Sequence, residues 1–288
     1  ELWLFGTDSV EVWYNSGEAD FPLTRIQGAF NEIGCVAPYS VAKLDNGIFW
    51  LGADARGQGI VYRANGYTGQ RVSTHAIEYA IQSYGTISDA IAYTYQQEGH
   101  AFYVLTFPTA GKTWVYDVAV NSWHERAGFL NGDFTRHRSN CQAAFNNVPH
   151  VGDYENGNVY AFDLSVYADN GSPQKWLRSW RAIPTGQNDL KRTTHHMLQL
   201  DCETGVGLNS GQGSTPQVML RFSDDGGHTW SNERWVSMGA IGTYASRAIW
   251  RRLGMTTELR DRVYEVSGTD PVKLVIIGAE LAVSGTNA

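Results

Sequence analysis

The chain has 288 residues and a formal net charge of −7, and charged residues make up only 18% of it. It contains 31 glycines, 10 tryptophans and 15 tyrosines, a mixture of turn-forming and strand-forming residues that indicates an all-β protein. The acidic balance argues against tight, sequence-independent binding of nucleic acid. No apolar run reaches the length of about 18 residues that a membrane-spanning helix needs, so no membrane segment is predicted.

The cysteines also limit the possible classes. Cys35, Cys141 and Cys202 are far apart and odd in number, which argues against a disulfide framework or a structural zinc site. We expect reduced, buried thiols, as suits a reducing cytoplasm, and we expect no cofactor or metal.

The first two thirds of the chain repeat one pattern, a strand, a short turn and a second strand with a tyrosine near its end. The sequence opens directly on such a strand without an initiator methionine, which indicates that upstream residues are missing. The tyrosines stand at positions 14, 62, 116 and 160, with spacings of 48, 54 and 44 residues. A period of about 50 residues is typical of kelch-like β-propeller blades. A β-sandwich with similar strand spacing stays open as an alternative. The predicted strand pairs are 1–6 with 9–15, 47–52 with 59–64, 101–105 with 114–117, and 150–153 with 158–163.

Between these hairpins, residues 73–82 have apolar positions at helical spacing and predict a short helix capped by Ser73 or Thr74, or else an outer blade strand. Residues 89–95 predict a further strand. The pattern changes after about Pro184, where residues 184–194 read as a polar linker. We therefore predict blades over 1–184 and a C-terminal β region over 185–288, which could also complete the propeller.

The C-terminal region contains one sharp motif, which looks like an Asp-box, the small hairpin that recurs in β-propellers. We predict that the Asp225 carboxylate accepts backbone N–H groups of the turn and that the Trp230 ring packs beneath it. A catalytic role for Asp225 is the less favoured interpretation. The motif residues are Ser223, Asp225, Gly227, Thr229 and Trp230, between strands predicted at 218–222 and 235–238. Further strands are predicted at 196–201, 248–253, 262–266 and 272–281, the last long and apolar enough that we expect it to be covered.

We expect the other notable polar residues to have structural rather than catalytic or metal-binding roles. His195 and His196 are adjacent, so a strand directs them to opposite sides, and we expect two unrelated surface or half-buried histidines. Residues 136–138 (Arg-His-Arg) form a basic knot that could contact a phosphate or a neighbouring acidic subunit, although a solvated loop is the favoured interpretation. Asp153 and Asp163 are expected at a turn and a strand end. The seven arginines of the repeat region show no regular placement for a substrate clamp: Arg25, Arg56, Arg63, Arg71, Arg126, Arg136 and Arg138. We expect no enzyme activity.

Several stretches occur together in one family, namely 19–22, 25–30, 34–40, 49–52, 61–67, 224–233, 260–266 and 270–272. Through them the chain resembles the packaged-DNA stabilisation proteins of short-tailed bacteriophages, which are tail hub or nozzle proteins. The resemblance covers nearly the whole length.

The resemblance implies a structural virion protein of the phage tail, assembled in the host cytoplasm. It implies a homo-oligomeric, six-fold ring below the portal and adaptor proteins that extends and closes the DNA channel and anchors the tail needle, fibres or tailspikes. Double-stranded DNA would pass without sequence-specific binding, and the resemblance carries over no catalytic residues. Two alternatives stay open: a glycan-binding or glycan-cleaving β-propeller, and a kelch-like interaction module outside any virus.

Overall fold

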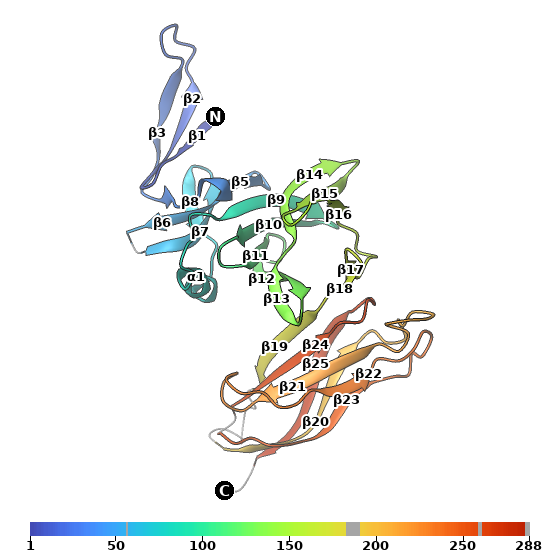
Figure 1. The fold of residues 1–288 in the computed structure, drawn as a ribbon. Coiled ribbons are helices and arrows are strands. Elements are labelled where there is room, and N and C mark those ends of the chain that lie inside the picture. The colour runs from blue at the N-terminus through green and yellow to red at the C-terminus, as the bar shows by residue number, and fades with distance from the viewer. Residues whose placement is uncertain (56, 183–190, 259–260, 286–288) are drawn as a thin grey trace. The chain divides into compact units, whose positions relative to one another are not determined.

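The computed structural model describes residues 1–55, 57–182, 191–258 and 261–285 (Figure 1). The chain divides into two units, residues 1–162 and 163–288, each with its own internal contacts. Strands dominate both units, and the described residues contain a single α-helix, α1 (His75–Gln82). The all-β prediction is therefore confirmed. None of the helices in the described ranges is long and apolar enough to cross a membrane.

The first unit consists of four antiparallel sheets that follow one another along the chain. Each sheet uses only strands that are consecutive in sequence. The strands are β1 (Leu2–Phe5), β2 (Val10–Asn15) and β3 (Leu23–Asn31); β4 (Gly34–Cys35), β5 (Ala42–Leu44), β6 (Gly47–Asp54), β7 (Gly57–Asn65) and β8 (Thr68–Arg71); β9 (Ile91–Gln97), β10 (His100–Phe107), β11 (Lys112–Asp117), β12 (Ser122–Leu130) and β13 (Asp133–Arg136); and β14 (Ser139–Phe145), β15 (Val148–Asp153) and β16 (Val159–Ala161).

The four predicted hairpins are present as β1–β2, β6–β7, β10–β11 and β15–β16. The repeated tyrosines have different environments. Tyr62 and Tyr116 are buried and Tyr160 is half-buried, whereas Tyr14 is exposed near the end of β2, beyond the buried Val10 and Val12.

Apolar side chains fill the spaces between successive sheets. Val10 packs with Trp50 and Tyr62 between the first and second sheets. Phe49 and Tyr103 stack between the second and third sheets, and Val151 joins the third and fourth. This face-to-face packing of small sheets is the construction of a propeller.

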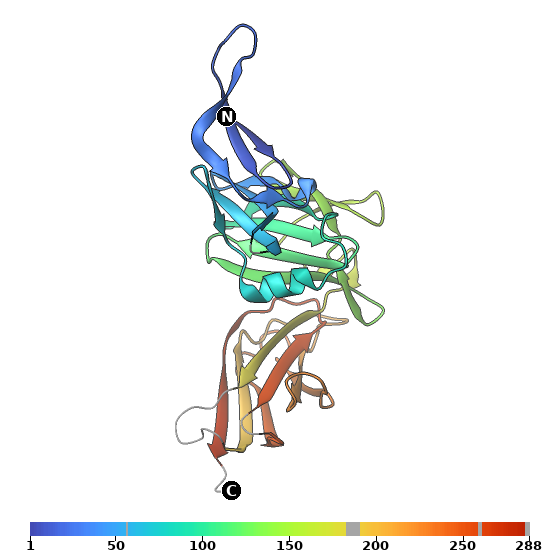
Figure 2. The same ribbon diagram turned by 90° about the vertical axis from the view of Figure 1, so that its left-hand side faces the viewer.

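Helix α1 occurs where residues 73–82 predicted one, and Figure 2 shows it beside the sheets. The Thr74 hydroxyl caps it by accepting the N–H of Ile77 at 3.5 Å. Ile77 and Ile81 face the core. On the same helix the buried Glu78 carboxylate bonds Arg71 and, at 2.7 Å, the Ser73 hydroxyl, so the helix is held to the end of β8.

The second unit is a β-sandwich preceded by a small hairpin of β17 (Ala168–Asp169) and β18 (Ser172–Pro173). Its two sheets have the strand orders β19-β24-β21-β22 and β23-β20-β25. Leu198 and Trp250 of one sheet and Leu220 and Val266 of the other meet in the core. The strands are β19 (Trp176–Ala182), β20 (Thr193–Cys202), β21 (Gln217–Ser223), β22 (Arg234–Ser237), β23 (Ala248–Met255), β24 (Arg262–Gly268) and β25 (Ile276–Gly285).

Two C-terminal predictions need comment. The last strand begins at Ile276 rather than at 272, and it pairs with β20 alone as an edge strand. Leu281 packs on the core, but Ile277 is 75% exposed on the other side, so the expectation of a covered strand is wrong for that face. Most of the linker predicted at 184–194 lies outside the described residues, and the domain boundary near 184 stays a prediction.

Candidate functional site

The Asp-box residues lie together in the turn between β21 and β22. The Asp225 carboxylate accepts the N–H groups of His228 at 2.9 Å and Thr229 at 2.8 Å. It also accepts the hydroxyls of Ser223 and Thr229, each at 2.6 Å. These donors favour the charged form, and the Ser223 hydroxyl is foremost among them in holding the pKa of Asp225 well below its usual range. The carboxylate therefore points into the turn's own donors.

The rest of the motif shapes the turn around this carboxylate. Gly226 and Gly227 have φ angles of +74° and +101°, a conformation that other residues rarely adopt. The Gly227 N–H donates to the Ser223 hydroxyl at 2.8 Å. On the Trp230 ring lies the guanidinium of Arg221, 4.6 Å from its centroid. The structural role of the motif stays a prediction, and this geometry supports it.

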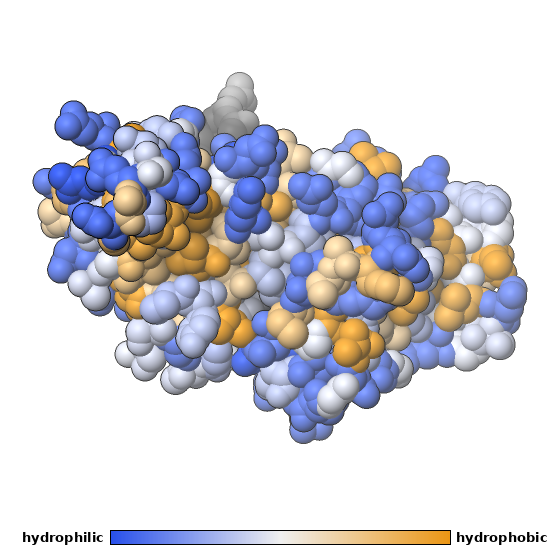
Figure 3. Space-filling model, turned by 90° about the horizontal axis from the view of Figure 1, so that it is seen from above, coloured by the Kyte–Doolittle hydropathy of each residue, from blue (hydrophilic) through white to orange (hydrophobic). Residues whose placement is uncertain are grey.

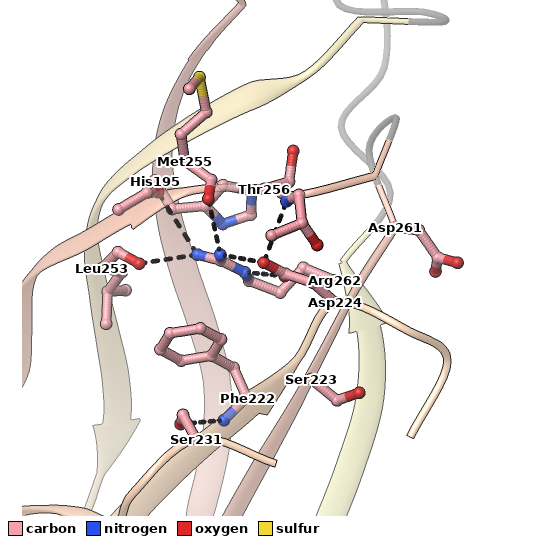
Figure 4. A network of polar contacts seen from close by, with 12 residues as sticks. His195, Phe222, Ser223, Asp224, Ser231, Leu253, Met255, Thr256, Asp261 and Arg262 are labelled. Carbon is pink, nitrogen blue, oxygen red and sulfur yellow. Dashed lines mark hydrogen bonds and ion pairs between the residues drawn. The ribbon is translucent and has the colours of Figure 1, made fainter. Parts of the chain in front are cut away.

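Behind the turn lies a buried ion pair that the sequence analysis missed (Figure 4). The Arg262 side chain is only 1% exposed, and its Nε and Nη2 atoms meet the two Asp224 oxygens at 2.6 and 2.7 Å. The Arg262 guanidinium also donates hydrogen bonds to the carbonyls of Leu253 at 2.8 Å and Met255 at 3.2 Å. The Arg262 guanidinium also stacks 4.1 Å from the ring centroid of Phe222.

This pair joins three segments of the sandwich. Asp224 belongs to the Asp-box turn, the carbonyls end β23, and Arg262 begins β24. Asp224 also accepts the N–H of Thr257 at 3.2 Å. Burial acts to lower the pKa of Arg262, but its bonds to the Asp224 carboxylate raise that pKa above the ordinary value. The guanidinium is thus charged and fixed.

The two adjacent histidines have different surroundings. His195 is buried; its Nδ1 lies 2.7 Å from the Tyr264 hydroxyl and its Nε2 lies 2.9 Å from the Thr193 hydroxyl. Burial, and then the positive charge of Arg262, lower the pKa of His195 to about 4. His196 is exposed and lies 2.8 Å from the Ser284 hydroxyl. The expectation of a surface or half-buried residue is wrong for His195, because the sandwich closes over that side of β20.

The basic knot includes the loop that was predicted, since residues 137–138 connect β13 to β14, but its side chains are half-buried and paired rather than solvated. Arg138 pairs with Asp153 and Glu155, each at 3.0 Å. The Arg136 guanidinium lies 4.0 Å from the Tyr154 ring centroid. Burial and three neighbouring arginines lower the pKa of His137 to about 4. The prediction failed because the β15–β16 turn brings carboxylates and an aromatic ring to these residues.

The remaining candidates have local roles. Asp153 accepts the N–H of Glu155 at 2.7 Å in a turn, and Asp163 accepts that of Ser165 at 2.8 Å, as predicted for these positions. The described arginines of the repeat region do not converge, and Arg56 lies outside the described residues. Their partners are Glu11 for Arg25, Asp45 for Arg63, Glu78 for Arg71, and the rings of Tyr95, Phe102 and Phe162 for Arg126.

In the part of the chain that the structure describes, neither a metal cluster nor a disulfide is present. Within the described ranges, no group of three or more His, Cys, Asp or Glu residues is placed to hold a metal ion. The three cysteines are free, and Cys35 is buried as expected. Cys141 is exposed, so the expectation of a buried thiol is wrong there; it lies on the outer side of the edge strand β14.

Small propeller-type sheets followed by a β-sandwich define a two-part, all-β protein. Residues 1–193 match the family model described as Bacteriophage P22 Gp10, beta-propeller, and residues 176–284 match the model described as Bacteriophage P22 Gp10, beta-sandwich. The chain therefore belongs to the bacteriophage P22 Gp10 family of phage stabilisation proteins, which are structural components of the virion. A search of curated proteins finds no match to the chain.

Proposed function

We propose that the chain is a subunit of the phage tail hub or nozzle. In this proposal it forms a homo-oligomeric, six-fold ring below the portal and adaptor. The ring extends and closes the DNA channel, anchors the tail needle, fibres or tailspikes, and catalyses no reaction. The observation that carries the proposal is that both parts of one phage stabilisation family match this chain, in order and over residues 1–284.

The polar chemistry of the sandwich supports a scaffold role. The Asp225 carboxylate is occupied by four donors of its own turn. Arg262, Asp224 and His195 are likewise occupied by partners within the sandwich. Polar groups with such partners stabilise the loops of the sandwich, and their hydrogen bonds are made within the protein rather than to a substrate.

An uncovered face of the fourth sheet supports assembly. Strand register places eight side chains of β14, β15 and β16 on one face, and none of them is Asp, Glu, Lys or Arg. Phe145 and Val159 on this face are 67% and 68% exposed. Exposed apolar faces of this kind are typical of protein contacts. The eight residues, which we call the outer face of β14–β16, are Cys141, Ala143, Phe145, Val148, His150, Gly152, Val159 and Ala161.

Exposed apolar residues are not confined to that sheet. Leu2, Leu4 and Phe30 of the first sheet are each more than 40% exposed. Figure 3 shows apolar residues gathered in patches between hydrophilic ones on the face that it views. The net charge of −7 further suits a channel protein that DNA must pass without adhesion, because like charges repel.

The proposal is tested by the mass of the purified chain in solution, alone and mixed with portal and adaptor rings. We expect sedimentation analysis to show either ring-sized assemblies of the chain or its binding to the portal and adaptor rings. Val159→Lys should weaken assembly because it places a charge on the outer face of β14–β16. Tyr79→Lys, at an exposed position of α1, is the matched control. A chain that stays monomeric and binds neither the portal ring nor the adaptor ring contradicts the proposal. If that chain binds a glycan array, the glycan-binding alternative is favoured.

A further inference from the structure

The four sheets of the first unit form a row with two uncovered ends, β1–β3 (dark blue) and β14–β16 (light green) in Figure 1. Apolar clusters join the first sheet to the second, the second to the third, and the third to the fourth. None of these clusters contains residues of both the first and the fourth sheet, so no apolar core joins the two ends among the described residues.

The free face at the first end carries large side chains. Leu2 and Leu4 are each 43% exposed there, and Phe30 is 48% exposed. The two charged residues of this face bind each other, since the Glu11 carboxylate accepts a hydrogen bond from Arg25 at 3.0 Å. Strand register defines the face, which we call the outer face of β1–β3, as Leu2, Leu4, Glu11, Trp13, Asn15, Leu23, Arg25 and Phe30.

The outer face of β14–β16, at the other end of the row, is made largely of small residues. Strand register places Cys141 beside Gly152 in one row, and Ala143 and Ala161 on either side of His150 in the next. A Cβ added at Gly152 would stand 3.0 Å from the Cys141 sulfur, so the glycine keeps this part of the face low. The two ends of the row therefore differ in shape.

This difference decides which surfaces fit each other. Sheets that pack face to face lie about 10 Å apart, and their side chains fill the space when large residues of one sheet meet small residues of the other. Two small faces would leave voids, and two large faces would be overpacked. Each end thus fits the opposite end of another copy better than it fits itself. A contact between unlike surfaces of identical subunits is head-to-tail, and this kind of contact generates rings.

We propose that the outer face of β1–β3 of one copy packs on the outer face of β14–β16 of the next copy, so that the stacking of sheets continues from chain to chain. The Glu11–Arg25 pair leaves the contact without net charge, which limits the cost of removing it from water. The inference rests on the proposed function and deepens it, because it names the two surfaces that join neighbouring subunits of the ring.

The test uses the exposed Cys141 as one end of a cross-link. Leu4→Cys adds a thiol to the opposite end face, and the purified chain, alone and with portal and adaptor rings, is treated with a bismaleimide that spans about 10 Å, the separation of packed sheets. We expect a ladder of linked chains that extends to the complete ring. The ladder should be absent when Cys141→Ser is combined with Leu4→Cys. Tyr79→Cys, at an exposed position of α1, is the control for an added thiol elsewhere and should give no ladder.

Each other outcome overturns the inference in a distinct way. A link within single chains, identified by mass spectrometry, would show that the two end faces meet inside one chain. Linked dimers of the wild type would show that two β14–β16 faces meet around a two-fold axis. Ring-sized assemblies without a ladder would assign the ring contact to other surfaces, while the proposed function stands. A wild-type chain that forms no ring and binds neither the portal nor the adaptor ring overturns the proposed function as well.

Discussion

Arg262 shows how a single buried charge is made tolerable. Removing a guanidinium from water costs several kcal/mol unless opposite charge and hydrogen bonds replace the lost hydration. Here a carboxylate binds it through two atoms, and the carbonyls that end β23 take further donations. The pair thereby ties the Asp-box turn to two other segments, and this linkage can be measured.

We expect Asp224→Asn to lower the free energy of unfolding of the sandwich by about 3–5 kcal/mol, because the buried Arg262 loses its countercharge. Urea denaturation followed by tryptophan fluorescence measures the change. Arg181→Ala is the control: it breaks the more exposed pair of Arg181 with Asp261, and a loss below about 1 kcal/mol is expected. Equal losses in the two variants would show that Arg262 is not held by Asp224.

His195 gives a second prediction, on pH. Its pKa is about 4 in the folded chain, against an ordinary value of 6.5. Between these values the unfolded chain binds the proton and the folded chain does not, so the stability of the sandwich falls as pH drops from 6.5 to 4. The ionisable groups near His195 from outside β20 are Arg262 and Tyr264 of β24 and Asp224 of the Asp-box turn.

We expect His195 to account for about 1–3 kcal/mol of this loss. Denaturation of the wild type and of His195→Gln at both ends of the pH range measures it. The decrease in the free energy of unfolding from pH 6.5 to pH 4 should be smaller in His195→Gln than in the wild type by about 1–3 kcal/mol, whatever the absolute stability of the variant. An unchanged loss would mean that another group carries the pH dependence.

Single-residue contacts could be predicted from the sequence only where the two partners are close together along the chain. The Asp-box contacts all fall within a few residues, so a motif could predict Asp225 and its donors. Arg262 pairs with a residue 38 positions away. Nothing in the sequence distinguishes either partner from an ordinary surface charge. The same holds for His195, whose partner Tyr264 is on another strand.

Among the elements, α1 depends on the Glu78 carboxylate as well as on its apolar face. Glu78 is buried and receives bonds from Arg71 and Ser73. We expect Glu78→Ala to lower the free energy of unfolding of the first unit by about 1–3 kcal/mol, because those donors lose their buried acceptor. Denaturation with helix-sensitive circular dichroism measures this.

The neighbouring Tyr79 provides the control for α1. It is 79% exposed, so Tyr79→Ala should stay within about 0.5 kcal/mol of the wild type. If both substitutions have the same small effect, the helix is held by its apolar residues alone.

Elements were predictable where their contacts are local. The four hairpins of the first unit join neighbouring strands, so the repeat period of tyrosines and turns was enough to place them. The sandwich differs, since β19 pairs with β24 and β20 with β25 across most of the unit. No short-range pattern contains those pairings, so the sequence could not show that β25 is an edge strand with one exposed face.

For the whole molecule, the separate cores predict separate unfolding. The core residues of the first unit and those of the sandwich form different clusters. We therefore expect two thermal transitions by calorimetry, and Asp224→Asn should lower only one of them. A single transition that shifts as a whole in this variant would show that the two units unfold together.

The strand order also has a consequence for synthesis on the ribosome. Each sheet of the first unit can form once its own few strands have emerged, because its partners are neighbours in sequence. Strand β19 instead stays unpaired until β24 has been translated, and β20 lacks one neighbour until β25 follows. During that interval Trp176 and Trp180 have no sandwich core to enter, and nascent chains on one messenger expose the same unpaired strand to each other. The translation rate over residues 183–275 should therefore affect the yield of soluble protein more than the rate over any stretch of the first unit.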